Sequence, residues 1–452
     1  MDYNPIKRNI YKDHNPIKIM VETIEILQKM NPWWIGKDFD YGLIRGKYLE
    51  KIKSYLTTRE ILILTGVRRA GKTTLLFQTI KYLLEKGVEP KQILFVNFDE
   101  VDVSSLKDSI RNVIGSFYNE IADRNKKAYI FFDEIQNVNE WEKWAKTIYD
   151  EKKDQLIISG SSSYLLAGNL ARLISGRYFL IDVFPLDFNE YLKFKNVKIE
   201  KRLDLISRKN EITKLLKKYL KEGGYPRVVL EDNEKLKGEH LKNYYESIVL
   251  KDVILIHKVR QEKLMNELIY YLASNFTQLY SYKNLSEFLS ADFSTIKEYL
   301  GYIEGSKSFF ELSIFSYSLK KQSRNNKKIY CIDTGLRNSI SFKFSEDEGK
   351  LAENLVFVEL KREEKEIYYW QNEKGNEVDF IIKNKDNSLE AINVSFTDEV
   401  KERELAGLIE FNKSFKMVKE LTVLTKDLEK KEDNVLFIPL WKWLLEKKLN
   451  RF

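Results

Sequence analysis

The stretch Gly66-Val-Arg-Arg-Ala-Gly-Lys-Thr73 matches the pattern G-x-x-x-x-G-K-[ST]. It follows an apolar run of strand length at 60–65 and precedes residues 73–84, where apolar side chains recur at helical spacing. Strand, glycine loop and helix in this order are the context in which the pattern predicts a phosphate-binding loop. Glycines at positions 66 and 71 allow the backbone to curl, so that successive N–H groups point toward an anion. The N-terminal end of the following helix adds positive potential.

The loop predicts a site for ATP and Mg²⁺. Lys72 is expected to reach the β- and γ-phosphates, and the hydroxyl of Thr73 is expected to bind Mg²⁺. Arg68 and Arg69 could touch phosphate or a neighbouring element. A glycine turn without a ligand is the alternative interpretation. The predicted nucleotide-binding residues are Gly66, Val67, Arg68, Arg69, Ala70, Gly71, Lys72, Thr73 and Thr74.

A second motif lies downstream in Tyr129-Ile-Phe-Phe-Asp-Glu134, an apolar strand that ends in two acids. Beside a phosphate-binding loop, Asp133 is expected to bind Mg²⁺ directly or through water, and Glu134 to polarise the water that attacks the γ-phosphate. Two acids in a surface turn are the alternative. Their position after a phosphate-binding loop favours the functional interpretation.

Two further positions are candidates for contact with the reacting phosphate. Residues 156–162 end in hydroxyl side chains that could contact the γ-phosphate or the attacking water, or could cap the next helix. We select Ser162, although the sequence does not separate it from Ser161. Arg177 is a candidate arginine finger, a group that often acts from a neighbouring subunit, so the prediction includes a homo-oligomer. Arg172 competes with it, and a surface arginine in a turn is the alternative.

Composition excludes several classes of protein. The chain has 452 residues, of which 43% are hydrophobic and 32% charged, and its apolar runs are too short to span a bilayer. The N-terminus lacks the apolar core of a signal peptide. Only Cys331 and three scattered histidines are present, which argues against disulfides and against a histidine-based metal site. We therefore expect a cytoplasmic protein with no membrane partner.

The order of elements predicts an α/β fold. Five strands that are apolar on both faces alternate with helices, which implies a parallel sheet covered on both sides, with nucleotide at the carboxyl ends of the strands. Residues 187–258 are mostly helical and charged, with a turn at 222–226. The predicted strands are 60–65, 92–98, 128–132, 155–159 and 178–183.

Residues 259–345 suggest a winged helix. Two helices, 282–289 and 292–303, precede two strands, 309–315 and 328–332. In the second helix we expect the polar residues Ser294, Thr295 and Lys297 to be exposed. We expect the apolar residues Phe293, Ile296 and Leu300 to face inward.

The loop at 320–328 of this region predicts a contact with DNA. It carries five cations and no acid, and the longer segment 307–343 has eight basic and two acidic residues, a local charge of +6. Such a loop suits phosphate contacts, which position a protein on DNA without specifying sequence. A solvated hairpin loop and a protein–protein module are the alternatives.

The residues resemble a known family. Segments 64–75, 131–136, 159–162, 175–178 and 184–191 are similar to prokaryotic AAA-type ATPases of archaeal and bacterial genomes, and the resemblance continues along most of the chain. The N-terminal Asn31-Pro-Trp-Trp34 is similar to archaeal members. The resemblance implies a P-loop NTPase core of AAA type, a winged helix and a C-terminal α/β domain similar to PD-(D/E)XK nucleases, and we interpret the helical region between the first two as a lid. The predicted segments are an N-terminal arm at 1–45, the ATPase domain at 46–190, the lid at 191–258, the winged helix at 259–345 and the nuclease-like domain at 346–452.

The nuclease-like domain lacks the residues that its chemistry needs. The pattern requires an acid on one strand and acid-x-lysine on the next, so that the acids hold a metal and the lysine steadies charge near the attacking water. Asp379 supplies the first acid, but the next strand has Asn393-Val-Ser395, and Glu390 is out of phase with the same face. We therefore predict an inactive nuclease fold, unless a lysine from another element replaces the missing one.

Three functions follow from these observations. The first is an Mg²⁺-dependent ATPase coupled to DNA or to a DNA-bound partner. The second is a nucleotide-gated switch with little turnover. The third is an ATP-dependent nuclease.

Overall fold

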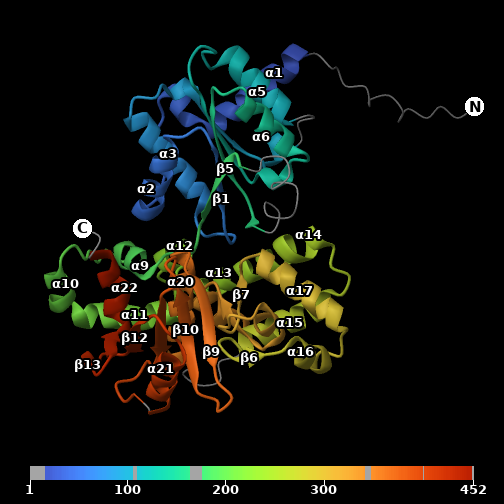
Figure 1. Ribbon diagram of the computed structural model, residues 1–452. Coiled ribbons are helices and arrows are strands. Elements are labelled where there is room, and N and C mark those ends of the chain that lie inside the picture. The colour runs from blue at the N-terminus through green and yellow to red at the C-terminus, as the bar shows by residue number, and fades with distance from the viewer. Residues whose placement is uncertain (1–15, 105–108, 163–175, 342–347, 401, 450–452) are drawn as a thin grey trace, which may run out of the picture. The chain divides into compact units, whose positions relative to one another are not determined.

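The computed structural model describes residues 16–104, 109–162, 176–341, 348–400 and 402–449 (Figure 1). The chain divides into two compact units. The first comprises residues up to Thr65 together with Lys72–Ile181, and the second comprises Gly66–Gly71 and the residues from Asp182 onward.

The first unit is built on a five-stranded sheet in the order β2-β3-β4-β1-β5. The pairs β1–β4, β2–β3 and β3–β4 are parallel, and every residue of β1 and β4 is buried. This arrangement confirms the predicted parallel sheet. The strands are β1 Ile61–Thr65, β2 Ile93–Asn97, β3 Tyr129–Asp133, β4 Gln155–Ser159 and β5 Tyr178–Asp182.

Helices cover both faces of this sheet (Figure 1). The chain passes from β1 to the far edge at β2 and then returns through β3 and β4. Right-handed crossovers therefore place the helix after β1 on one face and the helices after β2 and β3 on the other. The helices are α1 Pro16–Met30, α2 Gly46–Tyr55, α3 Lys72–Glu85, α4 Val101–Ser104, α5 Ser109–Glu120 and α6 Trp141–Asp150, with 3₁₀ turns η2 Pro32–Ile35, η3 Pro90–Gln92 and η4 Ile135–Asn137.

The described part of the N-terminal arm packs on this unit. The Asn31 amide exchanges two hydrogen bonds with the backbone of Phe95, at 2.7 and 2.8 Å. The indole nitrogens of Trp33 and Trp34 both donate to the carbonyl of Ile93. All of these bonds are made to β2, the edge strand of the sheet.

The second unit begins with helices. One of its turns is a π-helix, η5 Ile248–Ile254, which continues directly from α13. The helices before the next sheet are α9 Phe188–Phe194, α10 Arg202–Ser207, α11 Lys209–Glu222, α12 Pro226–Leu230, α13 Glu234–Ser247, α14 Leu255–His257 and α15 Glu262–Ser274.

A three-stranded sheet in the order β6-β8-β7 follows, with antiparallel pairs. Its strands are β6 Leu279–Tyr280, β7 Phe309–Leu312 and β8 Lys327–Cys331, and α16 Tyr282–Phe288 and α17 Phe293–Gly305 lie between β6 and β7 in the chain. Both helices lie where the sequence predicts them. Phe293 does not face inward as expected, since 52% of it is exposed at the first turn of α17.

The segment predicted as a basic loop is different in the structure. A short helix, α18 Leu319–Arg324, begins where the Ser318 hydroxyl accepts a hydrogen bond from the amide of Lys321. Lys327 and Lys328 then lie in β8 and are buried. The loop therefore exposes Lys320, Lys321 and Arg324, and two of the five predicted phosphate contacts are wrong because their side chains do not reach solvent.

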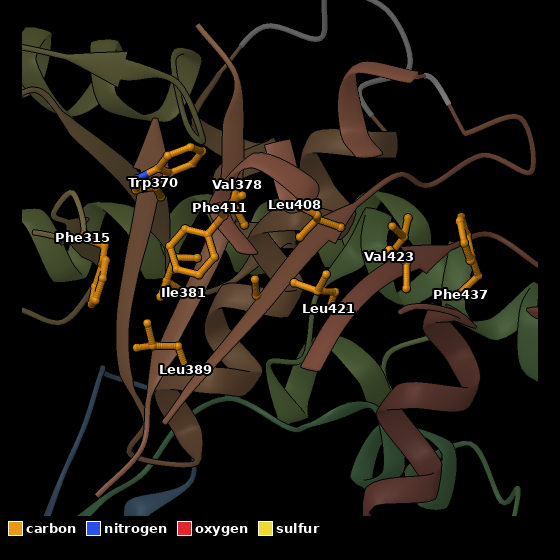
Figure 2. Close-up of a cluster of buried hydrophobic side chains, with 12 residues drawn as sticks. Phe315, Trp370, Val378, Ile381, Leu389, Leu408, Phe411, Leu421, Val423 and Phe437 are labelled. Atoms are coloured by element: carbon orange, nitrogen blue, oxygen red, sulfur yellow. The ribbon is translucent and has the colours of Figure 1, made fainter. Parts of the chain in front are cut away.

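The C-terminal part contains a six-stranded sheet in the order β13-β14-β12-β11-β10-β9. Its core contains Trp370, Ile381 and Phe411 of α21, and the rings of Trp370 and Phe411 meet edge to face at 5.4 Å (Figure 2). The elements are α19 Thr334–Ile340, α20 Glu348–Arg362, β9 Glu366–Gln371, β10 Glu377–Lys383, β11 Leu389–Val394, α21 Glu402–Ser414, β12 Val418–Thr425, β13 Lys430–Glu432, β14 Val435–Pro439 and α22 Leu440–Leu449. No described helix combines the length and the apolar character that a membrane span requires.

Candidate nucleotide-binding site

The glycine loop has the backbone conformation that an anion-binding turn needs. Positive φ angles occur at Gly66 (142°), Arg69 (65°) and Gly71 (99°). A Cβ atom at Gly66 would lie 2.1 Å from the carbonyl oxygen of Val183, so no larger residue fits there. The loop side chains Val67 and Ala70 are buried, and the Ala70 amide donates to the Val67 carbonyl at 3.4 Å.

Both arginines of the loop are engaged within the second unit. The Nε atom of Arg68 lies 2.9 Å from Oδ1 of Asp252, a residue of the π-helix η5 whose side chain is 2% exposed. The guanidinium of Arg69 lies 5.9 Å from the centre of the Tyr244 ring. Of the two roles that the sequence leaves open, the structure shows contact with a neighbouring element.

The first residues of α3 bring a lysine and two threonines to the carboxyl end of the sheet. Lys72 follows Gly71 directly and is buried, while Thr73 and Thr74 are half-buried. The hydroxyl of Thr73 donates to Oδ2 of Asp133 at 2.7 Å. The loop motif and the acidic motif, which are separated by about 60 residues, therefore meet as the sequence predicts.

Asp133 is a buried carboxyl group with hydrogen-bond donors on both oxygens. Its second oxygen accepts from the hydroxyl of Ser159, the last residue of β4. Burial and then the charge of Glu134 raise the pKa of Asp133 to about 6, although bonds from Ser159 and Thr73 and the charge of Lys72 act against them. A buried acid with surplus negative charge nearby is a place where a divalent cation would be stabilised.

Glu134 has a left-handed backbone, with φ 52° and ψ 43°. This turn directs the chain away from β3, and the Gln136 side-chain amide donates to the Glu134 carboxylate. The oxygen of the same amide accepts from the backbone of Ser161 at 3.3 Å. Glu134 is therefore held in place by a side chain that also contacts the segment after β4.

The hydroxyls of Ser161 and Ser162 are both buried, and the described residues provide no hydrogen-bond partner for either. The structure therefore does not separate the two serines, and the selection of Ser162 stays a prediction.

Arg177 is not part of this cluster. Arg177 lies just before β5, and its carbonyl accepts from the amide of Ile61 at the beginning of β1. It is therefore at the amino edge of the sheet, about 15 Å along the strands from the carboxyl edge where Lys72 lies. Arg177 cannot act as an arginine finger at the site of its own chain. Arg172 lies outside the described residues.

Three residues in or beside the site were not selected from the sequence. Ser159 precedes the selected serines and is distinguished only by its position in the strand between β3 and β1. Gln136 follows the acids by two residues, where its side chain can reach back. Asp252 is 184 residues from its partner Arg68, and no local pattern connects the two.

Asn393 lies on β11, where the expected nuclease pattern requires an acid. The Asn393 side chain is buried, accepts from the amide of Asp379 at 2.9 Å and donates to the carbonyl of Glu404 at 2.7 Å. It therefore ties β10, β11 and α21 together. Among the described residues, no group of three or more histidine, cysteine or acidic side chains is arranged to hold a metal ion.

Family models match three consecutive parts of the chain. An AAA domain matches residues 58–192, a domain of unknown function (DUF8612) matches 213–347, and a second domain of unknown function (DUF4143) matches 348–443. Together with the parallel sheet and the glycine loop, the first match shows that residues 58–192 form a P-loop domain of the AAA class.

Relatives match over nearly the whole length. An uncharacterized protein of Methanocaldococcus jannaschii is 32% identical over 447 residues, 95% of this chain and 94% of the relative. An uncharacterized protein of Haemophilus influenzae is 30% identical over 408 residues, 89% of this chain and 98% of the relative. The chain belongs to the family that these full-length proteins represent.

Similarity to solved structures is weaker. The Walker-type ATPase of Pyrococcus abyssi has a TM-score of 0.41 and 12% identity, covering 66% of this chain and 95% of that one. The Aeropyrum pernix ORC1 protein, solved in complex with DNA, has a TM-score of 0.34 and 10% identity, covering 68% of this chain and 95% of that one.

Proposed function

We propose that the protein is an Mg²⁺-dependent ATPase. The observation that carries this proposal is the meeting of Thr73, Asp133 and Ser159 at the carboxyl ends of β3 and β4, beside the first residue of α3. This edge is where open parallel sheets bind ligands. The polarity of these groups and the burial of Asp133 support a cation and a polyphosphate rather than an apolar ligand.

Each residue has a defined task in this proposal. The loop amides and Lys72 bind the phosphates, while the Thr73 hydroxyl and Asp133 hold Mg²⁺, directly or through water. When bound, Mg²⁺ neutralises charge on the phosphate oxygens. Ser159 keeps one oxygen of Asp133 hydrogen-bonded, Gln136 orients Glu134, and Glu134 accepts the proton of the attacking water.

Steady-state ATPase assays test this assignment. Lys72→Ala should abolish nucleotide binding, whereas Glu134→Gln should retain binding and lower kcat by about 10²-fold or more. Glu140→Gln, which changes an exposed acid after the same strand, is the matched control. Wild-type activity in both site variants would exclude the proposed roles.

A nucleotide-gated switch is the second candidate. The position of Arg177 supports a switch, because Arg177 cannot stabilise the charge of the transition state at the nucleotide site of its own chain. Turnover by an isolated chain should then be low and should rise with protein concentration if the arginine of a second copy completes the site. Turnover that is fast and independent of concentration would argue against both the switch and the role of Arg177.

We also propose that ATP hydrolysis is coupled to DNA or to a DNA-associated partner. The order of α15, β6, α16, α17, β7 and β8, with β8 between the other two strands, supports a winged helix. Its exposed cations Lys320, Lys321 and Arg324 lie on α18. The other basic residues of segment 307–343 are less available to DNA than the net charge of the segment suggests. Lys307 pairs with Asp182, and Arg337 is buried with its Nε donating to the Ala273 carbonyl.

The salt dependence of DNA binding distinguishes contacts made by the three α18 cations from attraction by the net charge of the protein. Changing the three α18 cations to glutamine should lower the slope of log Kd against log salt by about 2 to 3 for duplex DNA. The same number of substitutions at exposed lysines of α11, Lys214, Lys217 and Lys218, is the control. Equal losses in both variants would assign the binding to net charge alone.

We also propose that the C-terminal domain is a nuclease-like fold without nuclease activity. The structural role of Asn393 supports this, because its side chain already bonds to the Asp379 amide and to α21. An ATP-dependent nuclease would instead cleave DNA in a metal-dependent reaction that Asp379→Ala abolishes. Intact DNA after long incubation with Mg²⁺ and ATP is the expected result.

A further inference from the structure

An exposed aromatic ring lies beside the cations of α18. The side chain of Tyr317 is 76% exposed, and no aromatic side chain in the described part of the chain is more exposed. Tyr317 directly precedes Ser318, the residue that caps α18, and Leu319 at the beginning of the helix is 79% exposed. The helix cations and a ring open to solvent are therefore close neighbours in the chain.

The ring of Tyr317 is supported by the core of the C-terminal sheet. Its centre lies 5.5 Å from the centre of the Phe315 ring and 6.1 Å from that of Phe415. Phe315 belongs to the buried cluster of this sheet (Figure 2). The two neighbouring rings are inclined to Tyr317 by 67° and 59°, so neither stacks on it in parallel. The ring is held in place while most of its surface stays open.

The backbone of α18 is also fixed. The Gln322 side-chain amide donates to the Ser316 carbonyl at 2.6 Å, and the Asn325 amide donates to the Lys321 carbonyl at 2.7 Å. The buried ammonium of Lys327 donates to the Gln322 carbonyl. The helix therefore presents its side chains from a backbone that is bonded at both ends.

The three exposed cations share one face of α18. At 3.6 residues per turn, positions 320, 321 and 324 lie within about 100° of one another around the helix axis, and Gln322 lies on the opposite side. Lys320, Lys321 and Arg324 are all exposed. No acid occurs in segment 316–326. This face is therefore a local positive surface beside the ring.

The two lysines of β8 add nothing to this surface, because both are buried and bonded within the protein. Lys327 donates to the Ser313 hydroxyl at 3.0 Å. The ammonium of Lys328 is enclosed by three carboxylates of α20 and β10, those of Glu353, Glu377 and Asp379. The positive charge beside Tyr317 therefore comes from α18.

We propose that Tyr317, Lys320, Lys321 and Arg324 form a stacking surface that binds single-stranded DNA. The cations contact phosphates, and an unpaired base stacks on the Tyr317 ring. The faces of the bases in a duplex are covered by their neighbours, whereas an unpaired base has a free face. An acidic protein surface would match the charge alone, but a strand of phosphates and flat bases matches both the charge and the ring. This inference rests on the proposed coupling to DNA and names the form of DNA that is bound.

Fluorescence anisotropy with the full chain and three labelled probes tests the proposal. The probes are an oligothymidylate, an oligomer of the same length that carries the sugars and phosphates without bases, and a duplex. The wild type should bind the oligothymidylate about tenfold more tightly than the abasic oligomer, and Tyr317→Ala should remove this difference. Tyr317→Ala should bind the abasic oligomer and the duplex as the wild type does, which also shows that it is folded.

Two variants serve as controls for the ring. Tyr317→Phe retains an aromatic face and should bind all three probes like the wild type. Leu319→Ala removes an equally exposed side chain that has no ring, and it should leave the preference for the oligothymidylate unchanged.

The results separate this inference from the proposed coupling to DNA. Equal binding of the oligothymidylate and the abasic oligomer by the wild type overturns the stacking role of Tyr317. The same conclusion follows if Tyr317→Ala retains the preference, or if it loses affinity for the abasic oligomer to the same extent. Duplex binding that depends on the three α18 cations would still support coupling to DNA in these cases. If no probe binds, both proposals are overturned.

Discussion

Replacing Asp133 by asparagine should stabilise the first unit while it removes ATP hydrolysis. The side chain is 1% exposed, and its pKa rises from 3.8 to about 6 because of burial and the charge of Glu134. A shift of roughly 2 pKa units corresponds to about 3 kcal/mol that the ionised carboxylate costs the native state at pH 8. Asparagine carries no charge and removes this cost.

The gain is reduced by the hydrogen bonds that Asp133 accepts. Thr73 and Ser159 both donate to the carboxylate, and an amide has only one oxygen to accept them, a loss of about 1 kcal/mol. The net stabilisation is therefore about 2 kcal/mol at pH 8. The native state retains this proton to a higher pH than the unfolded state, so the cost grows as the pH rises from about 4 to above 6. At pH 5 the net gain should fall below about 1 kcal/mol.

Amide hydrogen exchange measures this effect in the correct part of the chain. Because the chain divides into two compact units, we do not expect whole-chain unfolding to be a two-state process. The slowly exchanging amides of β3 and β4 should become about 30-fold more protected at pH 8 in Asp133→Asn. Asp123→Asn, at an exposed acid of the same unit, should change nothing. Unchanged or lower protection in Asp133→Asn at pH 8 would refute the claim that the charge destabilises the empty site.

Three further changes test how the site is supported. Ser159→Ala removes a donor to Asp133 and should weaken the apparent Mg²⁺ affinity by about tenfold, which the Mg²⁺ dependence of ATPase activity reports. Arg68→Ala removes one ion pair of the buried Asp252 carboxylate and should lower the free energy of unfolding of the second unit in urea by about 2 kcal/mol. Asp252→Asn should cost less, because the Arg68 side chain is 17% exposed and can reach water, and the reverse order would contradict this reasoning. Gly66→Ala should abolish ATP binding in calorimetry, since its Cβ would lie 2.1 Å from a backbone oxygen, whereas Gly115→Ala in α5 meets no atom within 4 Å and should bind normally.

The parts of the site that follow local rules could be predicted from the sequence. The strand 155–159 has the predicted limits, and the predicted strand 60–65 differs by one residue. A loop after one parallel strand and acids after another must lie at the same edge of the sheet, so the meeting of Thr73 and Asp133 followed from the motifs alone.

The parts that depend on distant contacts could not be predicted. A count of basic residues treats Lys328 as a free surface charge, yet its three partners lie in other elements, and only the fold brings them together. The pairing of Arg68 with Asp252 is equally remote in the chain. The prediction that Phe293 faces inward was wrong for a different reason. Helical spacing identifies the residues that share one face of α17, but the first turn of the helix extends beyond the surface on which that face packs.

The side chain of Asn31 protects an edge of the sheet in the first unit. It satisfies both the N–H and the C=O of Phe95, and thereby imitates the strand that is missing beyond β2. An unprotected edge of this kind is a template for pairing with another chain. A protein shortened to the segment that matches the AAA domain, 58–192, would retain its sheet but lose this cover. We expect such fragments to associate with one another through β2, and soluble aggregates rather than unfolding would be the result of removing the arm.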